Sequence, residues 1–131
     1  MATSTIPIKS IKLLWTNPSP TTTFSGQKVS LDLSGYDAIG VAARPYMSSA
    51  YDYITPMVVA SRGDAQGVLM SFAGSSANYT GAFDCGVRGF NWDNSGVTFY
   101  GASEVNLSVN NTWQQGMNGH TIPVHIWGIK Y

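Results

Sequence analysis

The chain has 131 residues, and a hydrophobic share of 44% excludes a disordered protein. No apolar run approaches the roughly 20 residues that a membrane-spanning helix needs, so we expect no membrane insertion. Charged residues make up only 11%, seven Lys and Arg balance seven Asp and Glu, and the basic residues are scattered, which excludes the phosphate contacts of a nucleic-acid partner.

Apolar and polar residues alternate with period two along most of the chain, and this pattern predicts strands. The first predicted strand is Ile6–Trp15, which ends at Asn17–Pro20 because proline cannot donate to a sheet ladder. Lys28–Leu33 shows the clearest alternation of a half-buried strand. Ile39–Arg44 follows, and Pro45 closes it.

The second part of the chain predicts two hairpins and a closing strand. The remaining predicted strands are, in chain order, Tyr51–Ala60, Gly67–Ala73, Gly81–Trp92, Val97–Ala102, Glu104–Val109 and Thr121–Tyr131. Turn-rich segments at 61–66 and 93–96 make hairpins of the first four. Asn110–His120 is a predicted polar loop, and the strand after it carries apolar residues on both faces, which predicts burial on both sides.

Short strands separated by Gly, Pro and Asn turns, without helical periodicity, predict an all-β fold. We expect a single domain over residues 1–131, built as an antiparallel β-sandwich of about eight short strands. The jelly roll is one form that such a sandwich takes.

Subunit contacts are expected because near-zero net charge favours association. We therefore expect a homo-oligomer, with a trimer as one form and a monomeric domain as the alternative. Cys85 is the single cysteine, so no intramolecular disulfide stabilises the chain. Residues 1–8 lack the basic start and apolar stretch of a secretory signal peptide.

Patterns for catalysis and metal binding are weak. His120 and His125 are five apart and face opposite sides of an extended strand, so one metal could bind both only where the chain bends. No Gly-x-Ser-x-Gly elbow occurs, and Cys85 lies in a strand-like run. Few carboxylates are present to form the pair of a glycoside hydrolase. We expect no enzyme, no cofactor and no metal, with an unrecognised hydrolase as the remaining alternative.

A short motif occurs on the predicted turn at 61–66. Arg62, Gly63 and Asp64 spell the tripeptide that integrins bind, but a glycine between charged residues is also ordinary turn chemistry. The sequence does not decide whether the tripeptide has a role.

Tyrosines and serines are concentrated at residues 45–53. Tyr46, Tyr51 and Tyr53 offer rigid amphipathic rings, while the serines between them supply adaptable hydrogen bonds, a mixture typical of recognition loops. Tyrosines that cover the edge of a core would produce the same pattern.

A second candidate binding stretch covers residues 110–120. Asn111, Trp113, Gln114 and Gln115 place an aromatic ring among amides, and a sugar uses both, because its C–H face stacks on a ring while its hydroxyls bond to amides. A smaller version of this pattern is formed by Trp92, Asp93 and Asn94. The alternative is a tryptophan buried in a subunit contact.

Three segments of the chain carry a family pattern. The first is Leu14-Trp15-Thr16-Asn17-Pro18-Ser19-Pro20, and the second is Val29-Ser30-Leu31-Asp32-Leu33-Ser34-Gly35-Tyr36-Asp37. The third is the ending Ile122-Pro123-Val124-His125-Ile126-Trp127-Gly128-Ile129-Lys130. Together they resemble small tail-associated structural proteins of bacteriophages and prophages, either fibre and receptor-binding proteins or accessory ones, in which tyrosine is usual at the position of Trp127.

This resemblance implies a virion component of the tail or capsid surface, made in the bacterial cytoplasm without a signal peptide. Its implied role is attachment to a host-surface glycan or protein, and its other partners would be virion proteins. The alternative is a decoration or assembly protein that has no ligand of its own.

Overall fold

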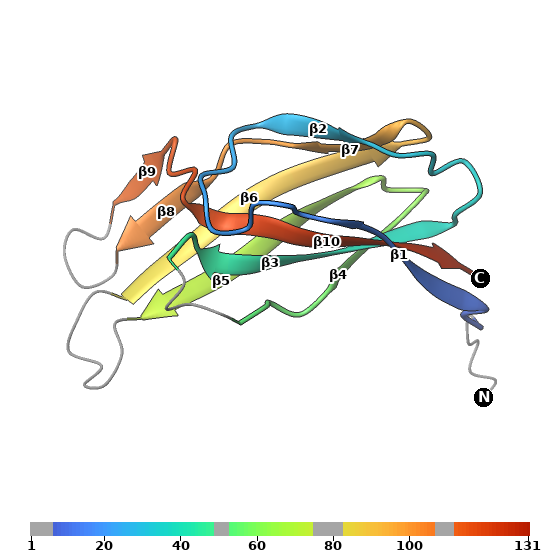
Figure 1. Cartoon of the computed structure of the whole chain (residues 1–131), viewed down its shortest axis with the longest axis horizontal. Coiled ribbons are helices and arrows are strands. Elements are labelled where there is room, and N and C mark those ends of the chain that lie inside the picture. Colours follow the sequence, from blue (N-terminus) through green and yellow to red (C-terminus); the bar gives the residue numbers. More distant parts are fainter. Residues whose placement is uncertain (1–6, 49–52, 75–82, 107–111) are drawn as a thin grey trace.

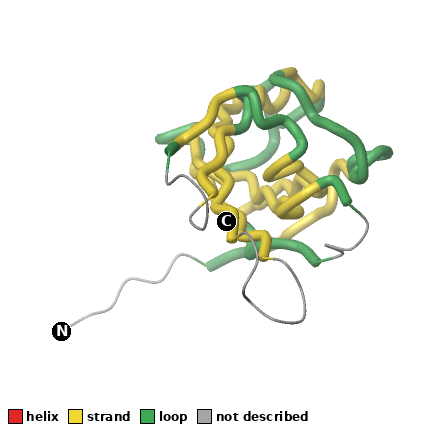
Figure 2. Tube along the Cα trace, turned by 90° about the vertical axis from the view of Figure 1, so that its left-hand side faces the viewer, coloured by secondary structure: helices red, strands yellow, loops and turns green. Residues whose placement is uncertain are grey.

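The computed structural model describes residues 7–48, 53–74, 83–106 and 112–131. These residues form ten strands in two antiparallel sheets that pack against each other (Figure 1), and Figure 2 shows only strands and loops between the grey segments. The predicted all-β, antiparallel β-sandwich is confirmed, while its finer form as a jelly roll stays a prediction. Within the described ranges no helix is long and apolar enough to cross a membrane.

The first sheet has four strands, in the order β1 (Ser10–Thr16), β10 (His120–Lys130), β3 (Ala38–Tyr46) and β4 (Val58–Ser61). The second sheet has six strands, in the order β2 (Gln27–Ser30), β7 (Gly96–Phe99), β6 (Phe83–Asp93), β8 (Ser103–Asn106) and β9 (Trp113–Gln115), with β5 (Gln66–Gly74) also paired to β6. β5 pairs with one edge of β6 along nearly its whole length. β7 and β8 therefore pair with the other edge of β6. β5 is therefore an edge strand among the described elements.

The hydrophobic core lies between the two sheets. On β6 the alternation of side chains sends Phe90 and Trp92 inward, where they join one cluster with Leu69 of β5 and Ile122 and Ile126 of β10. β10 lies between β1 and β3 and is mostly buried, as its two apolar faces predict. Burial of these side chains supplies most of the favourable free energy of folding.

The strands differ from the predicted ones in three places. In the described part of the predicted strand Tyr51–Ala60, the ladder begins only at Val58, the first residue of β4, and Pro56 just before it has no N–H to donate. Leu31–Leu33 lie outside β2 and bond instead to the turn after β6. The predicted polar loop contains β9, because Trp113–Gln115 pair with β8.

Arg88 of β6 is the largest fully buried side chain, with 1% of its surface exposed. Its Nε donates to the Thr121 carbonyl at 2.8 Å, and its Nη2 donates to the His120 carbonyl at 3.2 Å. Nη1 donates to the Tyr100 carbonyl at 2.6 Å, and the guanidinium lies 5.3 Å from the centre of the Phe24 ring. Burial lowers the pKa of Arg88 to about 10, so the side chain stays charged at neutral pH. One cation thus joins the two sheets through their backbone.

Replacing this cation tests how far the packing of the two sheets depends on it. Arg88→Met keeps an unbranched apolar stem but removes all three donors, and it leaves the carbonyls without partners. We expect a loss of roughly 2–4 kcal/mol in the free energy of unfolding, measured by urea denaturation. Lys12→Met, at an exposed position of β1, is the control and should change stability by less than about 0.5 kcal/mol. Equal midpoints for the two variants would contradict this role of Arg88.

Candidate functional site

The described residues among those predicted to bind a ligand lie at two opposite ends of the sandwich. Trp92 and Asp93 end β6 and Asn94 follows in the turn to β7, on the right in Figure 1, whereas β9 lies at the left. The left end, where β3, β5 and β8 finish and β6 and β10 begin, is called the β9 end below. The predicted residues therefore do not form one site.

The turn at Trp92 is held by contacts within the protein. Trp92 is only 4% exposed and belongs to the core, because it shares the inward face of β6 with Phe90. The Arg62 guanidinium lies 4.7 Å from the centre of its ring and donates to Asn94 Oδ1 at 2.6 Å. Asp93 accepts hydrogen bonds from the Ser95 hydroxyl and amide. This correction removes Trp92 from the set of rings that could stack on a ligand.

At the β9 end, Trp113 presents a side chain that is 52% exposed. Gln115 lies on the same face of β9, two residues further, while Gln114 lies on the other face, and both are exposed. Tyr46 ends β3, and its ring lies 4.8 Å from the His120 ring. The predicted site residues Tyr51 and Asn111 lie outside the described residues.

Strand register places Trp113 in a band of side chains on the outer face of the six-stranded sheet. Phe72 of β5 pairs with Cys85 of β6, Cys85 with Val105 of β8, and Val105 with Trp113 of β9. Directly paired residues share a face, so these four side chains form one row. Phe72 and Trp113 are exposed at its two ends, whereas Cys85 and Val105 are buried. We call this row the outer row.

Tyr53, the last of the predicted tyrosines, borders the outer row. Its hydroxyl donates to the Phe72 carbonyl at 2.9 Å, and its ring is exposed beside β5. An open, mainly apolar pocket of about 460 Å³ lies there. It is lined by Pro45, Tyr53, Ile54, Pro56, Val68, Met70 and Phe72, among others.

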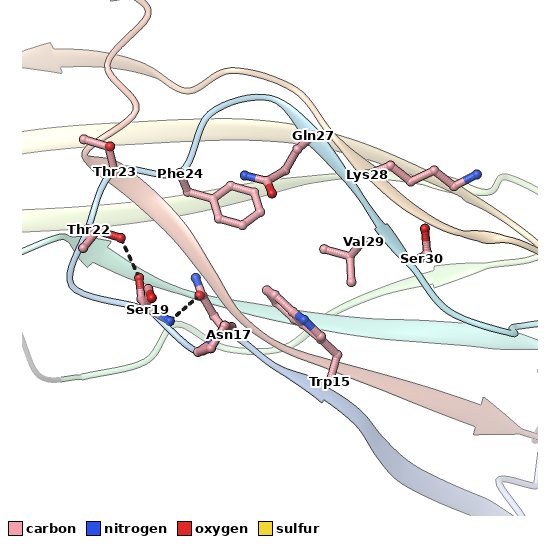
Figure 3. A pocket seen from close by; sticks show the side chains of 11 residues that line it. Trp15, Asn17, Ser19, Thr22, Thr23, Phe24, Gln27, Lys28, Val29 and Ser30 are labelled. Carbon is pink, nitrogen blue, oxygen red and sulfur yellow. Dashed lines mark hydrogen bonds between the residues drawn. The ribbon is translucent and has the colours of Figure 1, made fainter.

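Two further pockets have mixed polar and apolar linings. At the β9 end, a pocket of about 390 Å³ lies between Tyr46 and the 116–120 segment, and His120 lines it. Another, of about 460 Å³, lies beside the ends of β1 and β2 and contains Trp15 (Figure 3). In this second pocket Asn17 donates to the Pro123 carbonyl and accepts from the Ser19 amide, so its amide group is already used. From the sequence we predicted only the end of a strand at Asn17–Pro20, and no binding site there.

Three ionisable side chains meet inside the sandwich at the β9 end. Asp84 begins β6, Glu104 lies on β8 and His120 begins β10, and one ligand atom from each lies within 4.8 Å of the others. Glu104 is 4% exposed and His120 is also buried. Sequence reasoning missed this cluster because the residues are 20 and 16 positions apart. A carboxylate within a predicted strand, next to apolar residues, was the one sign in the sequence that could have indicated this cluster.

The environment of the cluster shifts two of its pKa values in opposite directions. Burial, a hydrogen bond to Asp84 and the charge of Asp84 raise the pKa of Glu104 to about 7. Burial lowers the pKa of His120, and the Asp84 carboxylate partly opposes that effect. Both shifts favour uncharged side chains, as expected where water is excluded.

No protein-family model, curated protein or solved structure matches this chain.

Glu104 should make the stability of the protein depend on pH. A carboxyl group whose pKa is raised on folding from 4.5 to about 7 stabilises the fold fully below pH 4.5, and that contribution is lost as the pH rises through 7. His120, whose pKa is lowered, acts in the opposite sense, since its contribution is lost as the pH falls. Glu104→Gln removes only the first effect.

We expect the stability of Glu104→Gln relative to wild type to rise by roughly 1–3 kcal/mol between about pH 5 and about pH 8, in buffer with EDTA. Urea midpoints at the two pH values measure this difference. Asp64→Asn, which changes an exposed carboxyl group, is the control and should show no such rise. A pH-independent difference for Glu104→Gln would contradict the raised pKa.

Proposed function

We propose that the chain is a bacteriophage virion structural protein of tail-fibre or receptor-binding type, which binds a host-surface glycan at its β9 end. The observation that carries the proposal is the half-exposed ring of Trp113, with the exposed amide of Gln115 on the same face. The resemblance of three chain segments to small phage tail proteins supports the virion setting. Host-surface protein is the other class of ligand that such a surface could bind.

The chemistry of this surface suits a sugar. The apolar C–H face of a sugar ring stacks on an indole, and its hydroxyls bond to neutral amides. Of the four tryptophans, Trp113 is the one whose side chain is exposed, since Trp92 is buried and the other two are partly buried. Because the outer row carries no charged side chain, binding there should change little with ionic strength.

Repetition of the site would strengthen a weak interaction. We include in the proposal a homo-oligomer, such as a trimer, in which several copies of the site face the host. Linked weak sites raise overall avidity by about 10²- to 10⁴-fold when geometry allows simultaneous contact. The mechanism is binding without catalysis, and the absence of reducing ends after incubation with polysaccharide would agree with it.

A second candidate function is decoration or assembly of the virion, and the apolar surface of β5 favours it. Val68, Met70 and Phe72 point outward from this edge strand, and each is about half exposed. Exposed apolar side chains on an edge strand are typical of contacts between subunits. In this reading the aromatic residues contact other virion proteins and no host ligand.

Two variants separate the candidate functions. Trp113→Ala should weaken binding of the labelled protein to cells or wall polysaccharide of its host by at least about tenfold, because central aromatic contacts carry much of a binding energy. Gln27→Ala, in the pocket of Figure 3, is the control and should bind as wild type does. The oligomer mass, measured by light scattering, should be the same for both.

Met70→Glu tests the assembly function by placing a charge on the surface of β5. If Met70→Glu prevents incorporation into virions and the wild-type chain binds no host, the receptor-binding proposal is wrong and the assembly function replaces it. Host binding that stays intact in Trp113→Ala would show that Trp113 is not the contact that carries it. Loss of host binding in Gln27→Ala alone would instead move the ligand to the pocket beside Trp15.

A further inference from the structure

The cluster of Asp84, Glu104 and His120 brings together the side chains that metal ions bind in proteins. The three residues come from β6, β8 and β10, so both sheets contribute. Each offers one ligand atom, and these atoms lie within 4.8 Å of one another. Three ligands around one tetrahedral ion, at about 2.1 Å from it, stand about 3.4 Å apart, so small side-chain rotations would complete the geometry.

The carboxyl groups of the cluster, on Asp84 and Glu104, have no lysine or arginine partner among the described residues. Arg88 is the buried cation on the same strand, and its donors bond to three backbone carbonyls. Glu104 is buried and Asp84 is partly buried, so a proton or a bound cation would stabilise the two neighbouring carboxyl groups.

A second observation shows an unused ligand atom. Oδ1 of Asp84 is buried and has no hydrogen-bond partner within the described ranges of the chain. A buried carboxylate oxygen without a donor is destabilising, and most buried polar atoms in proteins have a partner. A cation beside this oxygen would replace the missing donor.

From these observations we propose that Asp84, Glu104 and His120 bind one divalent transition-metal ion of the zinc type. An imidazole ligand favours Zn²⁺ and its neighbours over Ca²⁺ and Mg²⁺, which prefer oxygen ligands. Of the three residues, His120 alone lines the pocket of about 390 Å³ at the β9 end, so the ion would enter past this ring. A water would supply the fourth ligand of a tetrahedral ion. The ion would tie together β6, β8 and β10 next to Trp113.

Metal titration of the whole, EDTA-stripped chain tests the proposal. Zn²⁺, followed by calorimetry, should bind with one ion per chain, and Co²⁺ should show the visible absorption of a site with fewer than six ligands. At about 100-fold excess over Kd, Zn²⁺ should raise Tm by roughly 5–10 °C. Millimolar Ca²⁺ or Mg²⁺ should not displace it. An absence of saturable Zn²⁺ and Co²⁺ binding in the wild-type chain would overturn the proposal.

The two histidines of the chain provide a matched pair of variants. His120→Gln should lower Zn²⁺ affinity by at least about tenfold, as should Glu104→Gln. His125→Gln is the control and should bind Zn²⁺ as wild type does, because this ring contacts the Thr16 hydroxyl and the Trp127 ring. Loss of binding in His125→Gln, or full affinity in His120→Gln, would place the metal elsewhere and overturn the assignment.

The metal site and the glycan site can fail separately. Trp113→Ala should bind Zn²⁺ with unchanged affinity, since this side chain lies on the outer face of the sheet and the cluster on the inner face. Zn²⁺ binding without any host binding would support the metal site while contradicting the proposed function. Host binding by a chain that takes up no Zn²⁺ would support the proposed function and contradict the metal site.

Discussion

The buried guanidinium of Arg88 is the interaction on which the arrangement of the two sheets depends. It extends from β6 into the space between the sheets and donates to carbonyls at the start of β10. A charged side chain in this position is stable only when its donors are satisfied, so the backbone at 120–121 must stay where it is. Thr121 there has a φ of 46°, an uncommon conformation for a β-branched residue. The hydrogen bonds from Arg88 hold the chain in that conformation.

The close approach of β10 to β6 also requires a small residue. A Cβ atom on Gly86 would lie 2.4 Å from Thr121 Oγ1, so only glycine lets the two strands meet at this point. The Thr121 hydroxyl is then within 2.7 Å of the Ser71 hydroxyl on β5. This end of the sandwich interior is accordingly polar, whereas the middle of the sandwich is filled by aliphatic and aromatic side chains. His120 and the carboxyl groups of the cluster lie in that polar part.

The two faces of the six-stranded sheet offer different chemistry at the β9 end. The inner face carries the acid and histidine cluster, and the outer face carries the outer row with Trp113 at its edge. A sugar or protein ligand could reach the outer face without disturbing the buried groups, because alternate residues of one strand point to opposite sides. The proposed metal ion would act on the same strands by linking them from the inside. Ligand binding and structural support would thus be separated by the thickness of a single sheet.

The sequence by itself determined that the chain is built from strands, because alternation of apolar and polar side chains is a local property of each segment. It also located the exposed Trp113 and the tyrosines as candidates, since residue type limits what a side chain can bind. Only the tertiary structure decided that Trp92 points into the core, because alternation leaves open which of two faces meets the other sheet. Residues 113–115 form β9 through pairing with β8, a partner that no local pattern specifies. The cluster of Asp84, Glu104 and His120 depends on the register of β6 with β8 and on the position of β10 across the sandwich, so it exists only after the sheets have packed.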